Sequence, residues 1–246
     1  MRRRDILPSG VAPPWALWQD SPDRNWIKEF GMTDFSARRI MMVDTQVRPS
    51  DVTKFPIIAA MLSVPREDYV PAALREAAYM GGNVDLAPSR VMLEARTLAK
   101  MLESLDINPT DRVLDLACGL GYGTAVIAEL CGQVIGVEED ADLAAAAQAQ
   151  LLAAGTKRAQ VRQGNLTQPA TEKYDAIVIE GGVEVLEEPV LSQLADGGRI
   201  AVIFMQGALG TVKIGTKNGN AVSWRFAFNA SAPVLSAFAA KRVFTL

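Results

Sequence analysis

The sequence predicts an α/β fold, in which a mostly parallel, doubly wound sheet carries helices on both faces and finishes with an antiparallel hairpin. Two observations predict it. From Arg112 onward, short apolar runs alternate with helix-forming runs, which is typical of parallel strands joined by crossover helices. Beyond residue 210 the helical runs stop, and two strand-like segments flank Asn218-Gly219, a dipeptide that favours a two-residue hairpin turn.

The individual elements follow from the same patterns. In the parallel part, strands are expected at 112–116, 133–137, 159–163, 174–179 and 199–204. The helices between them are expected at 123–130, 140–154 and 187–195. The second of these helices is alanine-rich and therefore loses little side-chain entropy on folding. In the tail, further strands are expected at 211–216, 222–227 and 241–246.

The chain divides into three parts. Residues 1–31 are rich in Pro, Trp and Arg and lack periodicity, so we expect a loosely ordered extension. Residues 32–105 have helical character, with Asp34 and Asp51 as expected N-caps. Helices are expected there at 35–43, 51–62, 71–80 and 93–105. Residues 106–246 form the expected α/β domain.

Composition excludes several classes of function. A net charge of −3 gives no basic footprint for nucleic acid, and no apolar run of about 18 residues is present to span a membrane. The chain has no histidine, which removes His-based acid–base chemistry and most zinc sites. The two cysteines, Cys118 and Cys131, form no metal motif. We expect reduced thiols, a cytoplasmic protein and no metal.

The run at 113–123, Val-Leu-Asp-Leu-Ala-Cys-Gly-Leu-Gly-Tyr-Gly, is the most informative part of the chain. An apolar strand ends at Asp115, a glycine-rich turn and a helix follow, and the next strand ends at Glu138. This order is the first half of a nucleoside-binding unit. The glycines let the backbone approach a ligand, and the Glu138 carboxylate can accept hydrogen bonds from both ribose hydroxyls.

The same run favours S-adenosylmethionine over NAD. In a dinucleotide fingerprint the third glycine would stand where Thr124 lies, and Asp115 would repel a pyrophosphate. S-adenosylmethionine has no phosphate and carries two positive charges, so nearby carboxylates favour it. An NAD(P)-dependent enzyme remains the less favoured alternative. The expected cofactor-binding residues are Asp115, Ala117, Gly119, Gly121, Glu138, Glu139, Asn165 and Leu166.

Several runs resemble the protein-L-isoaspartate O-methyltransferase family. They are the glycine motif with Tyr122 and Ala125-Val126-Ile127-Ala128, the segments at 174–179 and 193–199, and the N-terminal segments at 42–48 and 64–71. The last of these, Val-Pro-Arg-Glu-Asp-Tyr-Val-Pro, is the most specific to the family. The resemblance covers roughly residues 33–210. It implies a class I methyltransferase fold, S-adenosylmethionine as cofactor and a role in protein repair.

The chain departs from the family where the acceptor would bind. Family members carry Ile-Ser-x-Pro before the helix that leads into the cofactor strand, but here Leu93 stands at the serine and Ala95 at the proline. Leu93 and Glu94 are therefore the candidate substrate residues. The family's Gly-Asp-Gly is replaced by the segment 164–166, Gly-Asn-Leu, in which Asn165 can still hydrogen-bond an adenine edge.

Glu180 follows the fourth expected strand and is the candidate catalytic residue, to orient a substrate amine or to act as a base. The other interpretation is a solvated loop acid, or an acid at a helix start that the helix dipole favours. An ionised carboxylate acceptor needs no base. The predicted function is methyl transfer to a carboxylate or other small nucleophile, on a peptide or a small molecule. The alternative is a cofactor-binding protein that has lost isoaspartyl chemistry and serves as a sensor or interaction module. The acceptor and the oligomeric state stay open.

Overall fold

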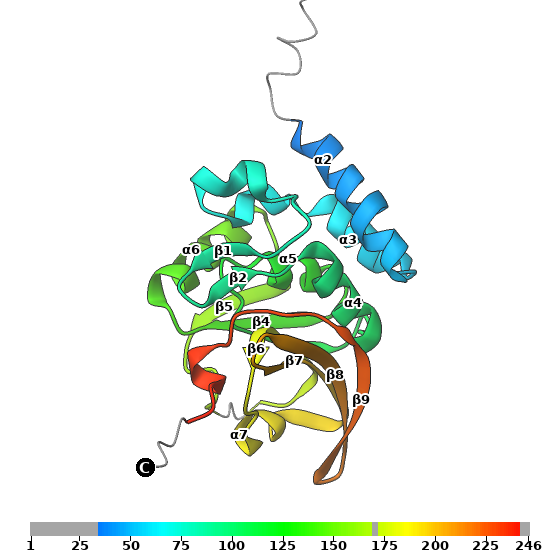
Figure 1. The fold of residues 1–246 in the computed structure, drawn as a ribbon, viewed down its shortest axis with the longest axis vertical. Coiled ribbons are helices and arrows are strands. Elements are labelled where there is room, and N and C mark those ends of the chain that lie inside the picture. The colour runs from blue at the N-terminus through cyan, green and yellow to red at the C-terminus, as the bar shows by residue number, and fades with distance from the viewer. Residues whose placement is uncertain (1–33, 169–171, 242–246) are drawn as a thin grey trace, which may run out of the picture. The chain divides into compact units, whose positions relative to one another are not determined.

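A seven-stranded sheet forms the centre of the protein (Figure 1). The structure is a computed structural model and describes residues 34–168 and 172–241. The strand order is β5-β4-β3-β6-β7-β8-β9, in which neighbouring strands are parallel up to β7 and antiparallel beyond it. The strands are β3 (Arg112–Leu116), β4 (Gln133–Glu138), β5 (Ala159–Gln163), β6 (Tyr174–Val183), β7 (Leu194–Gln206), β8 (Leu209–Asn218) and β9 (Ala221–Asn229). The predicted α/β architecture with an antiparallel end is confirmed.

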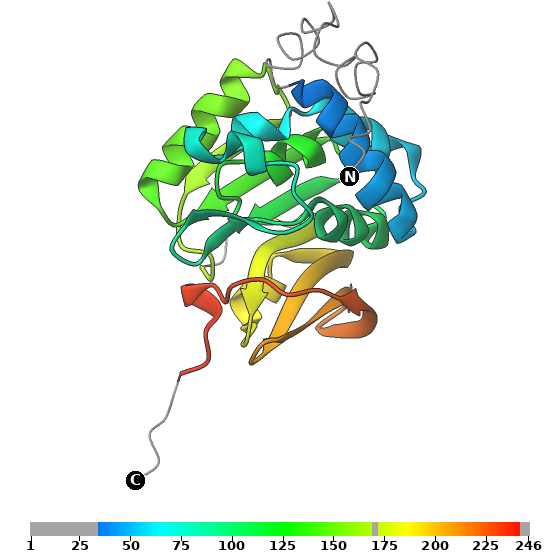
Figure 2. The same cartoon turned by 45° about the horizontal axis from the view of Figure 1, so that its top comes forward.

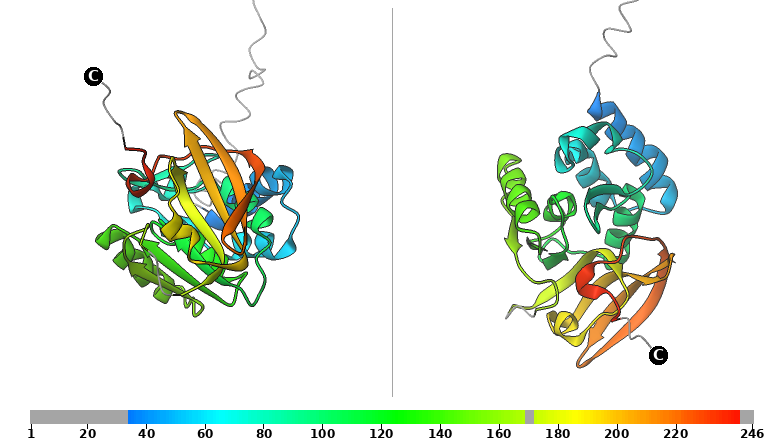
Figure 3. Two further views of the ribbon diagram at one scale, coloured as in Figure 1. Left: turned by 90° about the horizontal axis from the view of Figure 1, so that it is seen from below. Right: turned by 60° about the vertical axis from the view of Figure 1, so that its left-hand side comes forward.

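The two faces of the sheet are covered unequally. One face packs against the N-terminal helices and the two helices that follow β3 and β4, and these elements share one hydrophobic core. The other face is covered in the described residues by α7 and by a short 3₁₀ turn, Ser236–Phe238. Figure 3 shows β7, β8 and β9 at one end of the molecule. The helices are α2 (Phe35–Met42), α3 (Phe55–Ser63), α4 (Ala95–Leu105), α5 (Tyr122–Ala128), α6 (Ala141–Ala153) and α7 (Glu188–Leu191).

Helix boundaries in the N-terminal part differ from the prediction. Asp51 does not cap a helix: it has φ 63° and follows a 3₁₀ turn, and α3 begins after Lys54, with Pro56 in its first turn. The expected helix at 71–80 is a six-residue 3₁₀ turn, Ala72–Ala77. The expected helix at 187–195 shrinks to the four residues of α7, because β7 already begins at Leu194.

A short hairpin that the sequence did not reveal precedes α4. Its strands are β1 (Val84–Ala87) and β2 (Arg90–Met92), which pair antiparallel through a turn at Pro88-Ser89. Strands this short give no detectable alternation. Figure 2 shows the hairpin lying in front of the central sheet beside α4.

Two expected segments cannot be compared with the structure. The extension at 1–31 lies outside the described residues, as does the strand expected at 241–246 apart from Lys241, which is not in a strand.

Candidate cofactor and acceptor site

The glycine-rich turn connects β3 to α5 at the carboxyl edge of the parallel strands. Ala117, Gly119 and Gly121 all have positive φ, of 61°, 55° and 88°. Glycine adopts this backbone region without strain, whereas the β-carbon of an alanine is strained there by close contact with the backbone. Ala117 is thus a strained position in the turn, held by a 2.8 Å hydrogen bond from its N–H to the carbonyl of Val137.

Glu138, the last residue of β4, lies directly beside this turn. Its side chain is fully buried. Oε2 accepts a 3.0 Å hydrogen bond from the N–H of Gly119, and Oε1 accepts bonds of 2.8 and 3.2 Å from the N–H groups of Glu139 and Asp140. The backbone therefore fixes the carboxylate at the tip of its strand, beside the glycine turn.

Arg90 of the β1–β2 hairpin occupies the other side of this carboxylate. Its Nε lies 2.9 Å from Glu138 Oε1, and its Nη2 lies 3.0 Å from Glu139 Oε2. The same hairpin covers the turn, since a β-carbon at Gly119 would come within 2.6 Å of Leu86 Cδ1. Sequence reasoning missed Arg90, because nothing in a segment without recognisable periodicity marked it as a partner of β4.

Asp115 and Glu180 form a buried carboxyl pair beneath the start of α5. Their side chains are in hydrogen-bonding contact, yet no donor reaches Asp115 Oδ1 or Glu180 Oε1. Both facts hold if the two carboxyls share a proton, because ionised carboxylates only accept. Thr124 donates a 2.6 Å hydrogen bond to the other oxygen of Asp115. At position 123 a β-carbon would overlap the Glu180 carboxylate, so the glycine there makes room for the pair.

Burial shifts both acids of the pair in the same direction. Loss of solvent raises the pKa of Asp115 to about 7, a rise that the Thr124 hydroxyl opposes and the Glu138 charge assists. Loss of solvent, with Asp115 next, raises the pKa of Glu180 well above its usual range. Above about pH 7 the pair therefore carries one negative charge and one proton.

The environment of Glu180 corrects the sequence analysis in one respect. The residue does not follow the strand but lies within β6, which continues to Val183, and it is 3% exposed. It is therefore not a solvated loop acid. The expected strand at 174–179 ended before Glu180, Gly181 and Gly182. In the structure the two glycines lie in the strand, because Leu235 packs against the first and the N–H of the second donates to the Pro233 carbonyl.

Arg66 closes the site from the N-terminal side. The guanidinium is fully buried and donates 2.6 Å hydrogen bonds to the carbonyls of Ala78 and Leu93. It also lies over the ring of Tyr122, with its carbon 4.7 Å from the ring centroid. Burial lowers the pKa of Arg66, while Tyr122 and Glu180 oppose the change. A guanidinium stays protonated in proteins, so Arg66 contributes a positive charge beside the pair.

The two candidate substrate residues lie at the start of α4. Leu93 is fully buried and meets the site through its carbonyl, which binds Arg66. Glu94 is the residue before the helix; its N–H donates to Asn83 Oδ1 and its carboxylate accepts from Arg96 and from the Thr97 hydroxyl. The Glu94 side chain is thus engaged with its own helix.

Asn165 and Leu166 follow β5 on the other face of the sheet. Leu166 is fully buried in the second core. Asn165 Oδ1 accepts 2.8 Å bonds from the N–H and hydroxyl of Thr167, and the residue lines a cavity of about 200 Å³ together with Leu116 and Val137. The structure thus places Asn165 at the ends of the cofactor strands, apart from the buried acids.

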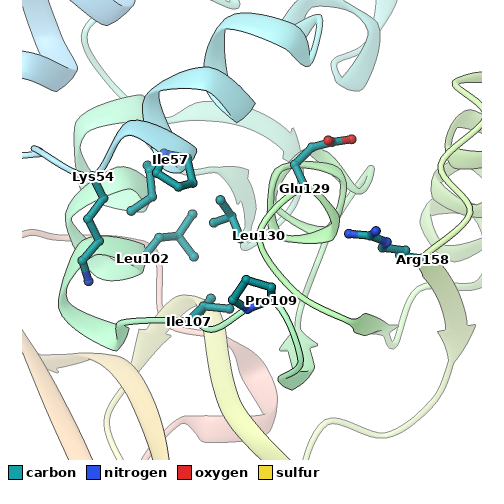
Figure 4. A pocket seen from close by; sticks show the side chains of 9 residues that line it. Lys54, Ile57, Leu102, Ile107, Pro109, Glu129, Leu130 and Arg158 are labelled. Atoms are coloured by element: carbon teal, nitrogen blue, oxygen red, sulfur yellow. The ribbon is translucent and has the colours of Figure 1, made fainter.

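A larger cavity, of about 360 Å³, lies at the opposite end of α5 (Figure 4). Apolar side chains of α3 and α4 line it, with Lys54, Glu129 and Arg158 at its margin. None of the expected cofactor residues contributes to it. Among the described residues, no group of His, Cys, Asp or Glu is arranged to hold a metal ion, and no helix is long and apolar enough to cross a membrane.

Comparison with known proteins assigns the family. Residues 40–225 match the family model described as "Protein-L-isoaspartate(D-aspartate) O-methyltransferase (PCMT)". The chain belongs to the PCMT family. It is 36% identical over 172 residues to protein-L-isoaspartate O-methyltransferase 1 of Rhodopseudomonas palustris (strain HaA2), covering 69% of this chain and 70% of that relative. It is 33% identical over 170 residues to the enzyme of Methylorubrum extorquens (strain PA1), covering 69% and 75%.

Solved structures of PCMT proteins share the fold. A Plasmodium falciparum protein described as a protein-L-isoaspartate O-methyltransferase, in complex with S-adenosyl-L-homocysteine, aligns with a TM-score of 0.69 at 17% identity, over 82% of this chain and 98% of that one. The predicted family, the class I methyltransferase fold and, at the level of the family, an S-adenosylmethionine-dependent methyltransferase are confirmed.

Proposed function

We propose that this PCMT member binds S-adenosylmethionine at the β3–α5 turn and transfers its methyl group to a small nucleophile. The observation that carries the proposal is the position of Glu138, fixed by backbone N–H groups beside Gly119. There its carboxylate can receive ribose hydroxyls, while the backbone at Gly119 and Gly121 lines the methionyl part. Asn165 and Leu166 would flank the adenine.

The charges of the site fit this cofactor. Asp115 and Glu180 are buried acids that share one proton, and the negative charge of Glu138 raises the pKa of both. A ligand that brings a sulfonium and an ammonium would compensate these acids, whereas a pyrophosphate would be repelled. When bound, S-adenosylmethionine supplies an electrophilic methyl group.

Binding of the second ribose hydroxyl requires Arg90 to release Glu138, since Oε2, which accepts one bond from the N–H of Gly119, has room only for the first hydroxyl. Oε1 of that carboxylate already receives three donors, from Arg90 and from the N–H groups of Glu139 and Asp140. A carboxylate oxygen has two lone-pair sites, so a further hydroxyl can bind Oε1 only after the guanidinium leaves. Arg90 keeps a second partner in Glu139 Oε2, at 3.0 Å, to which it can remain attached.

The acceptor is a peptide or small molecule that presents a carboxylate or another small nucleophile. The names of the relatives point to an isoaspartyl carboxylate, but Leu93 has no hydroxyl to bind it. That fully buried leucine also favours a second candidate function, in which the protein binds the cofactor without isoaspartyl chemistry and serves as a sensor or interaction module. Either function is compatible with a cytoplasmic protein.

Two measurements test the proposal. Calorimetric titration with S-adenosylhomocysteine should show binding, while NAD at the same concentration should not bind. Transfer of tritiated methyl from S-adenosylmethionine to an isoaspartyl peptide then separates the enzyme from the sensor. Binding of NAD in place of S-adenosylhomocysteine would contradict the cofactor assignment.

A further inference from the structure

We propose that β9, the edge strand of the central sheet, pairs antiparallel with β9 of a second copy of this chain about a two-fold axis. The protein would then form a dimer in which the two seven-stranded sheets become one continuous sheet. This inference goes beyond the proposed function and does not depend on it, because β6, β7 and β8 separate β9 from the strand that carries the cofactor turn.

The first argument is that the edge of β9 is free and unprotected. Among residues 34–168 and 172–241, β9 pairs only with β8, and it lies outermost in the sheet (Figure 1). Natural proteins usually block a free edge with lysine, proline or a very short strand. β9 has nine residues and contains neither lysine nor proline. Its one charged side chain, Arg225, is turned toward α4, where it donates a 2.8 Å hydrogen bond to the carbonyl of Ser104.

The backbone groups that point outward belong to Val222, Trp224 and Phe226. Asn218 and Ala221 flank the two-residue turn of the β8–β9 hairpin, so they form a hydrogen-bonded pair. Such pairs alternate with non-hydrogen-bonded pairs along an antiparallel ladder, and the pairing is regular from Ala221 to Phe226. The N–H and C=O groups of every second residue in this stretch are therefore directed away from β8, toward a further strand.

The second argument is the apolar strip that the same three residues form. Side chains alternate across a strand, so Val222, Trp224 and Phe226 share one face. The ring of Trp224 meets that of Phe204 edge-on, with the centroids 5.1 Å apart, on the face that α7 and the 3₁₀ turn cover. That cover leaves Phe226 62% and Trp224 36% exposed. An exposed, long apolar strand at a free edge is a site for pairing with another chain.

A second copy fits this edge in one register. If Trp224 lies opposite Trp224 of the other copy, Val222 lies opposite Phe226 of the other copy, and apolar side chains meet along the whole strip. On the other face Arg225 then lies opposite Ser223 of the other copy. A register centred on Arg225 would instead place two like charges directly opposite each other, which is destabilising. The edge is thus complementary to itself, as a two-fold contact requires.

The size of the contact sets the expected affinity. One strand and three apolar side chains of each copy take part, which is less than the standard interface of about 1,600 Å². The dimer should therefore dissociate in the range of about 1–100 μM. Because the two-fold contact uses β9 of both copies, the assembly stops at a dimer.

Sedimentation velocity of the full chain tests the proposal. The wild type should change from monomer to dimer between about 1 and 500 μM. Trp224→Lys and Phe226→Lys place charges in the apolar contact, so each should weaken dimerisation at least about tenfold. Leu209→Lys adds the same charge at a residue that is 77% exposed at the start of β8, outside the contact, and should dimerise like the wild type. Unchanged far-UV circular dichroism of Phe226→Lys shows that the variant still folds.

A pair of cysteines tests the register. Ser223 and Arg225 of the other copy would form a non-hydrogen-bonded pair, with Cα atoms about 4.5 Å apart, within reach of a disulfide. Ser223→Cys combined with Arg225→Cys should therefore give a covalent dimer on oxidation. Either substitution alone should not, because identical positions lie diagonally, about 7–8 Å apart. Cys118 and Cys131 are buried and free, so they give no background.

Three results would overturn the inference. A wild type that stays monomeric up to about 500 μM would leave the edge to another occupant or to none. A dimer that persists in both lysine variants would place the contact on another surface. A double-cysteine variant that forms no cross-link would exclude the antiparallel pairing of β9 with itself.

Discussion

Arg90 and Glu138 form a buried ion pair at the tip of β4, with the guanidinium Nε 2.9 Å from the carboxylate. The pair joins the β1–β2 hairpin to the residue proposed to hold the cofactor ribose. Because Oε1 cannot serve both Arg90 and the second of two ribose hydroxyls, binding of both hydroxyls and hairpin position are linked. The first two predictions follow from this competition.

Glu138→Ala is expected to weaken S-adenosylhomocysteine binding by roughly ten- to a hundredfold, since each lost charge-assisted hydrogen bond contributes about 1.5–3 kcal/mol. Isothermal titration calorimetry measures the change. Asp142→Ala, at an exposed acid in the first turn of α6, is the control and should bind like the wild type. Unchanged affinity in Glu138→Ala would remove the ribose assignment.

Arg90→Met should lower the stability of the ligand-free protein and raise its affinity for S-adenosylhomocysteine. Removal of one partner of a buried ion pair costs about 3 kcal/mol or more, which urea denaturation reports. Arg75→Met, which breaks an exposed pair with Asp68, should cost less than about 1 kcal/mol. Weaker ligand binding in Arg90→Met would mean that Arg90 supports the cofactor instead of competing with it.

Methylation of an isoaspartyl peptide by the wild-type chain is expected to be weak, because Leu93 can neither donate nor accept a hydrogen bond. Leu93→Ser should raise this activity in the tritiated-methyl assay, at a stability cost of about 2–5 kcal/mol for the lost apolar side chain. Leu93→Ala opens a similar cavity without the hydroxyl and should not raise it. Robust turnover by the wild type would show that the hydroxyl is dispensable.

The buried acid Asp115 should make stability fall as the pH rises. Its pKa in the folded protein is about 7 against 3.8 for the free side chain, so between these values the folded state binds more protons than the unfolded state. The stabilising contribution is complete below pH 4 and is lost as pH rises through 7. Asp115→Asn mimics the protonated acid, so the free energy of unfolding of the wild type should fall relative to this variant between pH 5 and pH 8. A constant difference would contradict the shift.

Ala117→Gly should stabilise the protein by up to about 1 kcal/mol, because it removes the steric strain of a β-carbon at φ 61°. The greater backbone entropy of glycine in the unfolded chain offsets part of this gain. Ala125→Gly is the matched control, an equally buried alanine inside α5, and should destabilise by about 1 kcal/mol. Chemical denaturation of both variants checks the opposite signs.

Local patterns were sufficient for the parallel sheet and for the glycine turn. Apolar runs and turn dipeptides are patterns of residues that are adjacent in the sequence, so β3, β4 and the β8–β9 hairpin could be predicted from them. The candidate site was predictable only in part. Glu138 and Glu180 stood out as acids near strand ends, but the contact of Glu180 with Asp115 depends on strand register between distant segments.

Arg90 escaped notice as a partner of this site for a similar reason. It binds Glu138, which is far away in the sequence, from a hairpin too short to show periodicity. The strand expected at 174–179 was too short, because Gly181 and Gly182 continue it through close packing that no local pattern reveals.

The two kinds of strand pairing in the sheet have a consequence for how the chain folds. The antiparallel strands β7, β8 and β9 pair with their immediate neighbours in sequence, down to Asn218 with Ala221, so they form at little loop-closure entropy. The acids Asp115, Glu138 and Glu180 come together only through the long-range parallel pairings of β3, β4 and β6, which form slowly. A partly folded chain would therefore contain the antiparallel strands β7, β8 and β9 before the three acids are brought together.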